Sequence, residues 1–382
     1  MSKIDELIER LCPDGVEYKK LSCLASYARE RIAASDLEPG SYVGVNELLQ
    51  EYRGRSYEVH VPSEEKCISY RPGDVLLGNI RPYLKKMWLA DCFGGTNGDV
   101  LVIRVCDAAQ LSPRFLWQVL AGRAFTEYNI SHSKGAKMPR GDKRAIMDFC
   151  IPVPPMEVQE EIVRVLDSFA ELEAELEAEL EARKRQYAYY RDRLLTFGER
   201  ERVRWVTLGE IASMKAGKAV AASNISECAN SVSSVRCFGA NGLRGYVSRP
   251  NQSGNAVLIG RQGALCGNVY FVDGDYYATE HAVVAVPREG VDCCYLFYAL
   301  AAANLNQFKT AGAQPGLSVE RLKRVKVALP DAETQCRIAK TLKQFDVLIN
   351  DISQGLPAEI EARRKQYAYY RDKLLSFKEK VA

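Results

Sequence analysis

One peptide occurs twice in this chain of 382 residues. Residues 181–197 read EARKRQYAYYRDRLLTF, and residues 361–377 read EARRKQYAYYRDKLLSF. The copies are identical at 13 of 17 positions, and the four differences exchange Lys with Arg or Thr with Ser. A near-verbatim repeat of this length indicates that one structural unit is used twice. The peptide is polar and aromatic and has no catalytic pattern, so it predicts two equal docking surfaces for two equal partners.

Each copy lies in a long predicted helix. The helices begin just after Pro154-Pro155 and Pro330, and Pro154 and Pro330 stand at an offset of 176 residues that grows to 180 inside the helix. The four extra residues are close to one helical turn, so an apolar stripe in steps of three and four stays in register. The stripe includes the repeated tyrosines. We therefore predict coiled-coil helices within residues 151–198 and 329–382, the second with a kink or gap near Gly355 because a proline follows two residues later.

A globular segment precedes each helix, over residues 1–150 and 199–328. Both segments begin with a related stretch and then reach a β-like apolar run that ends in Gly78 or Gly260. Beyond these runs the two sequences diverge. The predicted fold class is α/β (mixed α+β), with two tandem globular domains and two long helices built as an internal repeat.

Composition argues against several classes of protein. The chain holds twelve Cys but no CxxC pair, and only three His, so neither a disulfide framework nor a zinc site is indicated. The sequence has no signal-peptide pattern and no long apolar stretch, which argues against a membrane protein and favours the cytoplasm, where buried thiols stay free. A formal net charge of +3 is too weak to argue for nucleic acid by itself.

The sequence shows no catalytic constellation. His and Cys follow no pattern that would pair a nucleophile with a base. The glycine-rich stretches near Gly94 and Gly263 lack a phosphate-binding Lys and a Rossmann setting. Six Glu between Glu171 and Glu181 alternate with Leu and Ala, as on a solvated helix face. We identify no S-adenosylmethionine site, no other cofactor site and no metal site, so the sequence predicts a protein that reads a ligand and is not an enzyme.

The basic residues are concentrated in two segments of the sequence, and their positions are more informative about a nucleic-acid partner than the net charge. Residues 134–144 hold five Lys or Arg against Asp142, and residues 309–326 hold five against Glu320. Both segments stand just before the start of a long helix, so they occupy matched positions in the two halves. Matched basic segments indicate two phosphate-facing surfaces. A solvated run of charge is the alternative for either segment taken alone.

Four motifs follow one another in a specific order: LCPDGVEYKKL at 11–21, GNIRPYLKK at 78–86, IGRQG at 259–263 and the two QYAYYRD helices. Together with the internal repeat, they resemble the specificity (S) subunit of Type I restriction-modification enzymes over the whole chain. The resemblance implies two target-recognition domains that each read one half of a bipartite sequence in double-stranded DNA. It also implies an antiparallel, pseudo-two-fold coiled coil that sets the spacer and docks two copies of a DNA adenine methyltransferase (M) subunit. Such an assembly can also take up two restriction (R) motor-nuclease subunits.

Loops that follow the strand-like runs offer the candidate DNA contacts. Asn and Arg can pair bidentately with adenine and guanine, whereas Lys suits phosphate. In the first domain the candidates are Asn79, Arg81, Tyr83, Lys85, Lys86, Thr96, Asn97, Lys134, Lys137 and Arg140. In the second domain they are Arg261, Gln262, Asn268, His281, Lys309 and Gln314. A turn or surface position without base contact is the alternative for each. The candidate partner contacts are Tyr187, Tyr190, Arg191, Tyr367, Tyr370 and Arg371.

Two other classes of protein remain as alternatives. A self-standing nuclease would need clustered carboxylates with divalent-metal geometry, which neither globular segment shows. The other class is a stand-alone DNA-binding or coiled-coil adaptor protein without a restriction-modification partner. A purely structural adaptor would not need two divergent globular domains with basic edges.

The two ends of the chain are expected to lie close together. Residues 4–11 form a short amphipathic pattern. We predict that this segment packs beside the end of the second long helix, near Phe377.

Overall fold

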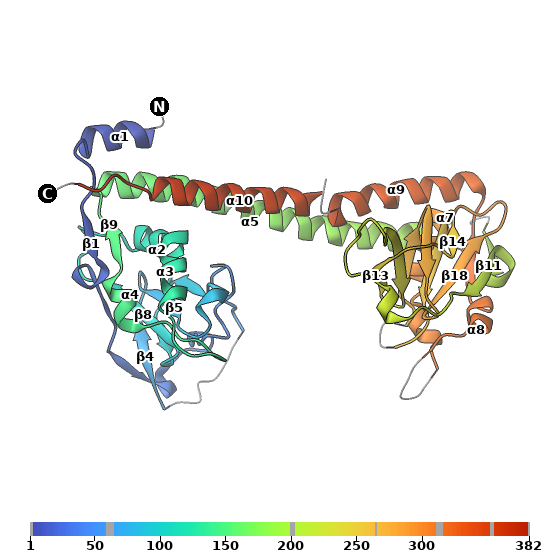
Figure 1. Ribbon diagram of the computed structural model, residues 1–382, viewed down its shortest axis with the longest axis horizontal. Coiled ribbons are helices and arrows are strands. Elements are labelled where there is room, and N and C mark those ends of the chain that lie inside the picture. Colours follow the sequence, from blue (N-terminus) through green and yellow to red (C-terminus); the bar gives the residue numbers. More distant parts are fainter. Residues whose placement is uncertain are drawn as a thin grey trace. The chain divides into compact units, whose positions relative to one another are not determined.

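The structure, a computed structural model, describes residues 3–58, 65–198, 203–263, 266–310, 316–351 and 355–380. The chain forms two compact units (Figure 1). The first unit combines Met1–Leu176 with Ile360–Ala382, and the second comprises Glu177–Glu359. One helix, α5 (Met156–Leu195), contributes residues to both units.

The first unit is built from short strands covered by helices. Its strands are β1 (Tyr18–Lys20), β2 (Ala25–Tyr27), β3 (Arg31–Ala33), β4 (Lys66–Tyr70), β5 (Val75–Gly78), β6 (Met87–Leu89), β7 (Gly94–Thr96), β8 (Val100–Val105) and β9 (Cys150–Pro152). Its short helices are α1 (Lys3–Leu11), α2 (Pro113–Ala121), α3 (Arg123–Ser131) and α4 (Lys143–Asp148). The sheet orders are β2-β8-β5-β6 and β3-β4-β7, and β1 pairs with β9. Every residue of β5 is buried, which explains its continuous apolar sequence.

The second unit repeats this plan. Its strands are β10 (Arg204–Thr207), β11 (Ala212–Ala216), β12 (Val235–Gly239), β13 (Gly242–Val247), β14 (Gln252–Ser253), β15 (Ala256–Gly260), β16 (Val269–Val272), β17 (Asp275–Ala278), β18 (Ala282–Pro287) and β19 (Lys326–Leu329). Its helices are α6 (Leu208–Ile211), α7 (Cys293–Ala302), α8 (Val319–Lys323) and α9 (Ala332–Asn350). The sheet orders are β11-β18-β15-β16 and β13-β12-β17-β14, and β10 pairs with β19.

One sheet is the same in both units, and the other differs. In the shared sheet, Gly78 at the end of β5 pairs with Val100, and Gly260 at the end of β15 pairs with Ala282. The loops after these strands therefore leave the two sheets at the same point. The remaining sheets have three and four strands, and the second of them contains a parallel pair, β12 with β17. A shared scaffold thus carries divergent elements.

The second long helix is interrupted, as predicted. Helix α9 ends at Asn350, and α10 (Leu356–Leu374) begins after Gly355. Pro357 falls in the first turn of α10, where its missing N–H would have no intrahelical partner anyway. Within the first unit, α10 runs antiparallel to the start of α5, because Arg364 contacts Glu173 at 2.6 Å and Tyr370 stacks on Phe169.

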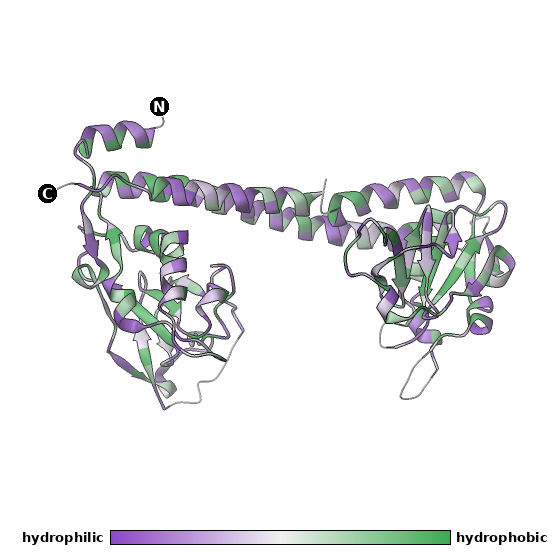
Figure 2. Cartoon of the chain, viewed as in Figure 1, coloured by the Kyte–Doolittle hydropathy of each residue, from purple (hydrophilic) through white to green (hydrophobic). Residues whose placement is uncertain are grey.

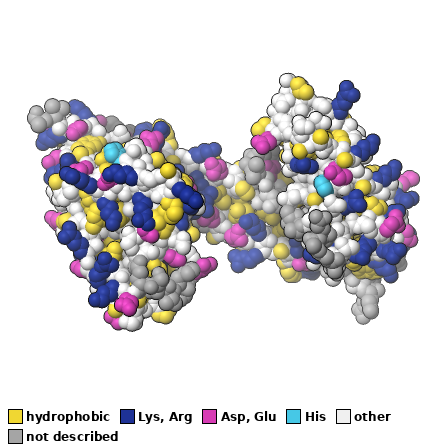
Figure 3. Space-filling view, turned by 60° about the horizontal axis from the view of Figure 1, so that its bottom comes forward, with side chains coloured by type: hydrophobic (Ala, Val, Ile, Leu, Met, Phe, Trp, Pro, Cys, Tyr) yellow, Lys and Arg dark blue, Asp and Glu magenta, His cyan; other side chains and the backbone are white. Residues whose placement is uncertain are grey.

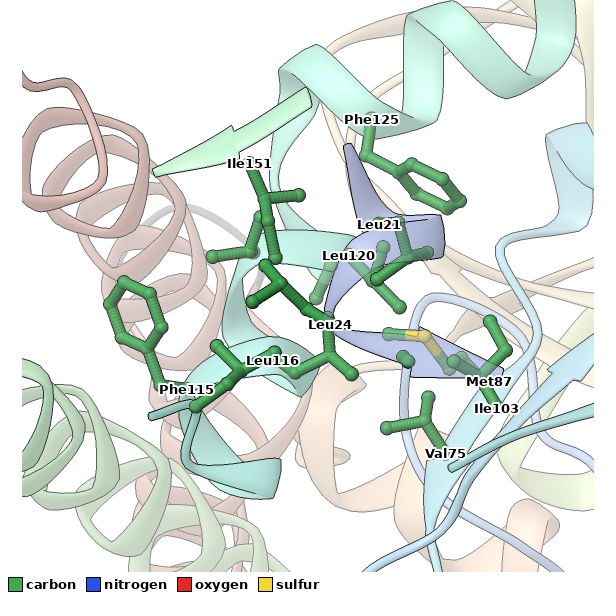
Figure 4. Close-up of a cluster of buried hydrophobic side chains, with 14 of the residues drawn as sticks. Leu21, Leu24, Val75, Met87, Ile103, Phe115, Leu116, Leu120, Phe125 and Ile151 are labelled. Carbon is green, nitrogen blue, oxygen red and sulfur yellow. The ribbon is translucent and has the colours of Figure 1, made fainter. Parts of the chain in front are cut away.

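In each unit, apolar side chains from the shared sheet, the short helices and the long helices form a large core, and other side chains of the same sheet belong to a smaller buried cluster. In the first core, Leu116 of α2 lies beside Leu24, whereas the ring of Phe115 points away from Leu24 (Figure 4). The long helices carry purple, hydrophilic residues along much of their length (Figure 2). Their ends beside the globular parts contribute fully buried side chains to the cores, such as Ile162 of α5.

The two ends of the chain pair with each other in the first unit, which confirms that prediction. The Val16 N–H donates to the Lys378 carbonyl at 2.8 Å, and the Lys380 N–H donates to the Val16 carbonyl at 2.9 Å. Gly15 has a φ of +103°, and a Cβ there would lie 2.6 Å from the Lys378 carbonyl oxygen. Only glycine fits this close approach.

All twelve cysteines are free thiols. Burial raises the pKa of the Cys293 thiol to about 12, as expected for a thiol inside a core. Among the residues that the structure describes, no helix is long and apolar enough to cross a membrane.

Candidate nucleic-acid interface

Three segments meet where the chain leaves β5 in the first unit. The Asn79 N–H donates to the Asp99 carbonyl at 2.9 Å, and the Gly141 N–H donates to the Asn79 carbonyl at 3.1 Å. The Arg81 N–H donates to the Pro139 carbonyl at 2.7 Å. We call residues 79–86, 97–99 and 134–141 the first three-loop edge. Most of the DNA-contact candidates of the first domain lie on this edge.

The loop after β5 is held in an unusual backbone conformation. Arg81 and Lys85 both have a φ of +52°, in the left-handed region that side chains disfavour. A second strained pair supports them, because the Glu51 and Tyr52 N–H groups donate to the Leu84 and Lys85 carbonyls. A strained backbone conformation is kept only where the surrounding contacts enforce it, and such residues are frequent in functional loops.

Several cations of the first edge are paired with carboxylates. Lys85 contacts Glu51 at 2.9 Å, and Arg140 contacts Asp99 at 2.9 Å. Lys134 contacts Asp142 at 2.5 Å, and this hydrogen bond, together with two backbone N–H donors, lowers the pKa of Asp142 to about 2. Asp142 also caps the start of α4. These surface pairs are weak and can exchange for phosphate.

Two exposed cations of this edge, Arg81 and Lys137, make no side-chain contact with an acidic group among the described residues. Tyr83 stands beside them with 49% of its surface exposed. Lys86 instead donates to the Val45 carbonyl at 2.7 Å, and burial lowers its pKa. Figure 3 shows Lys and Arg side chains spread over the face of the first unit that it turns to the viewer.

Two candidates of the first domain have buried side chains. Asn79 is 6% exposed, and its side-chain oxygen has no hydrogen-bond partner. This oxygen and that of Asn129 both lie over Gly141, where a Cβ would come within 2.9 Å of each. Thr96 is fully buried, and its hydroxyl donates to the Val43 carbonyl at 2.5 Å. Both residues support the loops from inside the domain, whereas Asn97 is half-buried on the edge itself.

An equivalent edge exists in the second unit. The Arg261 N–H donates to the His281 carbonyl at 2.9 Å, and the Leu317 N–H donates to the Arg261 carbonyl at 2.8 Å. These bonds match the Asn79–Asp99 and Gly141–Asn79 bonds of the first edge one for one. We call residues 261–263, 279–281 and 316–317 the second three-loop edge. A short helix follows each edge and is capped by an oxygen-bearing side chain, Asp142 for α4 and Ser318 for α8.

Polar side chains on the second edge form a connected network. The His281 ring contacts Gln262 through Nδ1 at 2.7 Å and Glu280 through Nε2 at 3.2 Å. Arg261 donates through Nη1 to the Glu280 carbonyl at 3.4 Å. Arg, Gln, His and Glu side chains together can both donate to and accept from base edges.

The other candidates of the second domain are distributed differently. The Asn268 carbonyl accepts from the Gly260 N–H at 2.8 Å, so this residue lies beside the start of the edge. Lys309 is exposed and precedes residues 316–317 of the second three-loop edge in the sequence. Gln314 lies outside the described residues.

The repeated tyrosines make contacts inside the chain. In the second unit, Tyr187 and Tyr190 pack on Phe345, with ring centroids 6.2 and 5.7 Å apart. In the first unit, Tyr367 and Tyr370 stack on Phe169 at 6.3 and 5.4 Å. Burial raises the pKa of Tyr187 to about 12 and also raises that of Tyr367. Intramolecular packing therefore accounts for part of the repeated sequence.

Two further tyrosines of the repeat are more exposed than these. Tyr189 is 59% exposed and Tyr369 is 62% exposed. Arg191 pairs with Asp192, whereas Arg371 lies over the rings of Tyr52 and Tyr367. Sequence reasoning missed Tyr189 and Tyr369, although counting around each helix from the apolar stripe would have put them on the outer face.

Two buried glutamines were also missed as functional groups. Gln159 and Gln335 stand at the same offset of 176 residues near the helix starts, and both are buried. Each makes three hydrogen bonds to backbone groups of the loop before α2 or α7 and of the turn before its own helix. The signal available in the sequence was the recurrence of a glutamine at the same place near the start of both long helices.

The described part of the chain contains no group of three or more His, Cys, Asp or Glu side chains arranged to hold a metal ion.

Comparisons with known proteins agree with this geometry. Residues 82–182 and 201–362 match the family model of the Type I restriction modification DNA specificity domain. The EcoprrI specificity subunit of Escherichia coli is 49% identical over 208 residues, which cover 53% of this chain and 52% of that protein. A putative type I specificity subunit of Haemophilus influenzae is 28% identical across 95% of this chain and 96% of its own length. The chain thus spans about half the length of the first relative and nearly all of the second.

Solved structures show the same fold at low sequence identity. The S subunit of a Type I restriction-modification system from M. genitalium has a TM-score of 0.61 and 15% identity, covering 94% of this chain and 96% of that one. The HsdS subunit of Thermoanaerobacter tengcongensis has a TM-score of 0.52 and 19% identity, covering 96% and 97%. The family model alone matches well over half of the sequence. The chain therefore belongs to the Type I restriction-modification DNA specificity family.

Proposed function

We propose that this chain is the DNA-reading subunit of a Type I restriction-modification complex and that each three-loop edge reads one half of a bipartite target. The observation that carries the proposal is the matched hydrogen-bond frame of the two edges, Asn79–Asp99–Gly141 and Arg261–His281–Leu317. The backbone hydrogen bonds of the two edges are the same, but the side chains of the residues that make them differ. Equal frames with different side chains suit two half-sites of different sequence.

The exposed side chains of each edge divide into two roles. Among the described residues, no carboxylate pairs with Arg81 or Lys137, so both present charge that suits phosphate and guanine. The Gln262–His281–Glu280 network presents donors and acceptors at fixed positions, which suits base edges. Asn79 supports the first loop from inside the domain. Its buried side-chain oxygen has no hydrogen-bond partner in the described residues and could accept from a bound water.

We further propose that the long helices dock two methyltransferase subunits and set the spacer between the half-sites. The repeated peptide supplies two equivalent surfaces, on which Tyr189 and Tyr369 are the exposed anchors beside Tyr190 and Tyr370. Exposed tyrosines are frequent anchors of protein interfaces. The chain itself carries no proposed catalytic residue, and the methyltransferase supplies the cofactor.

Substitutions on one edge at a time test this proposal. The measurement is fluorescence anisotropy of the full chain, bound to its methyltransferase, on a duplex that carries the host's bipartite methylation motif. Arg81→Ala with Lys137→Ala should reduce the salt dependence of binding by about 0.9 per lost phosphate contact. Arg261→Ala should relax discrimination at the second half-site alone, at roughly 1–3 kcal/mol if it reads a base.

The matched control is Arg123→Ala, an exposed arginine at the start of α3 that pairs with Glu127 and is not one of the edge residues. It should leave the affinity and the salt dependence unchanged. If the edge variants behave like this control, or if Arg261→Ala affects both half-sites equally, the edges do not read DNA in the way proposed.

A further inference from the structure

The two units differ at one place on their long helices. In the first unit, α1 packs on the start of α5, where Lys3 contacts Glu161 at 2.9 Å and Arg10 contacts Glu157 at 3.3 Å. Ile4 is 4% exposed and belongs to the core. Figure 1 shows α1 beside the start of α5, near both ends of the chain. The described part of the second unit contains no helix in the corresponding position.

The surface that corresponds to the α1 site is an open groove in the second unit. The groove has a volume of about 370 Å³ and lies between the end of α5 and the start of α9. Its lining includes Leu194, Phe197, Thr334, Arg337 and Ile338. By the repeat offsets of 180 and 176 residues, their counterparts in the first unit are Leu374, Phe377, Val158, Glu161 and Ile162. The groove is therefore the vacant equivalent of the surface that α1 covers.

Exposure of the paired positions supports this equivalence. Val158 and Glu161 are 0% and 6% exposed in the first unit. Their counterparts Thr334 and Arg337 are half-buried and exposed, respectively. Ile162 and Ile338 are both buried, so the floor of the site is unchanged. Only the outer layer, which α1 supplies in the first unit, is missing from the described part of the second.

Charge decides which helix can fill the groove. The buried carboxylate of Glu161 receives Lys3 of α1, but its counterpart is the cation Arg337. Arg193 lies on the rim of the same groove. The α1 helix of a second copy would bring Lys3 against Arg337, and like charges at this distance repel. The groove therefore suits a helix with a carboxylate where α1 has Lys3.

We propose that this groove docks an amphipathic helix of a different protein chain, with α1-like apolar spacing and an acidic residue that faces Arg337. The apolar residues would follow the spacing of Ile4, Leu7, Ile8 and Leu11, which pack against the first core. A basic residue seven positions after the acidic one would meet Glu333, the counterpart of Glu157. This proposal does not depend on the DNA-reading role proposed above.

Two synthetic peptides provide the test. Both carry residues 1–12 of this chain, with a hydrocarbon staple between positions 5 and 9, which are exposed in α1. The staple offsets the low helicity of so short a peptide. One peptide keeps Lys3, and the other carries Lys3→Glu. Binding of each fluorescent peptide to the full chain is measured by anisotropy at low salt.

The Lys3→Glu peptide should bind about two- to tenfold more tightly than the Lys3 peptide, because an attractive charge pair replaces a repulsive one. Arg337→Glu in the protein should reverse this preference, whereas the control Arg324→Glu, outside the groove, should not. Phe197→Asp should abolish binding of both peptides by placing a charge in the apolar floor.

The proposal is overturned if neither peptide binds, if the preference does not respond to Arg337, or if the Lys3 peptide binds better. The last result would indicate that the groove accepts α1 of a second copy. Phe197→Asp could disturb folding, so the reversal by Arg337→Glu, at an exposed position, is the decisive readout.

Discussion

Replacing either buried glutamine should loosen one globular part without affecting the other. Gln159 accepts from the Ser112 N–H at 2.9 Å and donates to the Gln110 and Pro154 carbonyls at 2.9 and 2.8 Å. Gln335 accepts from the Asp292 N–H at 2.9 Å and donates to the Gly290 and Pro330 carbonyls at 3.2 and 2.9 Å. Each glutamine therefore ties the loop before α2 or α7 to the start of its long helix.

The structure sets the size of the effect. Leucine has nearly the volume of glutamine, so Gln159→Leu and Gln335→Leu remove three hydrogen bonds and leave little cavity. A typical hydrogen bond contributes about 0.5–1.5 kcal/mol net, so three bonds correspond to about 1.5–4.5 kcal/mol. Water can reach the partly exposed loop groups and restore part of this. We expect a local loss of about 2–4 kcal/mol, of similar size at both positions.

Hydrogen exchange followed by mass spectrometry measures this loss where it occurs. Gln159→Leu should speed exchange in residues 107–116 and leave residues 288–297 unchanged, and Gln335→Leu should do the opposite. The control is Gln50→Leu, at an exposed position, which should change neither segment. Unchanged exchange in both variants, or equal loosening of both segments by one substitution, would refute the assignment of each glutamine to its own domain.

Three further predictions concern the helices. Arg164 and Lys3 hold the pKa of Glu161 at about 2, below its ordinary value of 4.5, so this carboxylate stabilises the fold fully above pH 4.5 and loses that effect as the pH falls toward 2. Glu161→Gln should therefore lower the denaturant midpoint at pH 6 but not near pH 2, and a gap independent of pH would contradict the ion pair. Phe169→Ala and Phe345→Ala should each cost about 1–3 kcal/mol, since both rings are half-buried against repeated tyrosines, and thermal unfolding that matches wild type would exclude this packing role. Deleting residues 174–177 shortens α5 by about 6 Å, so the methylated target should keep both half-sites and lose one or two base pairs of spacer; an unchanged spacer at full activity would show that the helix does not set the distance.

The internal repeat and the helix-breaking residues predicted the features that depend on residues close together in the sequence. The proline after Gly355 predicted the interruption between α9 and α10, because proline cannot continue a helix interior. The two chain ends lie close together as predicted, although Val16 makes the contact with Lys378 and Lys380, and the amphipathic first segment pairs with the start of α5. Equivalent apolar runs predicted that the loops after Gly78 and Gly260 occupy corresponding places in the two domains. The resemblance to specificity subunits is confirmed by the family match.

Features that depend on distant packing could not be predicted in this way. Asn79 looks like a surface residue in sequence, and only the approach of Asn129 and Gly141 buries it. The apolar stripe included Tyr187, but the sequence did not show which side chain of the facing helix it contacts, namely Phe345. The pairing of Lys134 with Asp142 reduces the charge available to a ligand, which a count of basic residues does not reveal.

A domain exchange, followed by single-molecule methylome sequencing of the cells that carry it, tests whether each edge reads its own half-site. In that variant, residues 16–150 are replaced by the corresponding domain of another specificity subunit, and the first three-loop edge is exchanged with them. We expect one half of the methylated bipartite motif to change to that of the donor, while the other half is retained. A motif in which both halves change, or neither does, would contradict the assignment of one half-site to each edge.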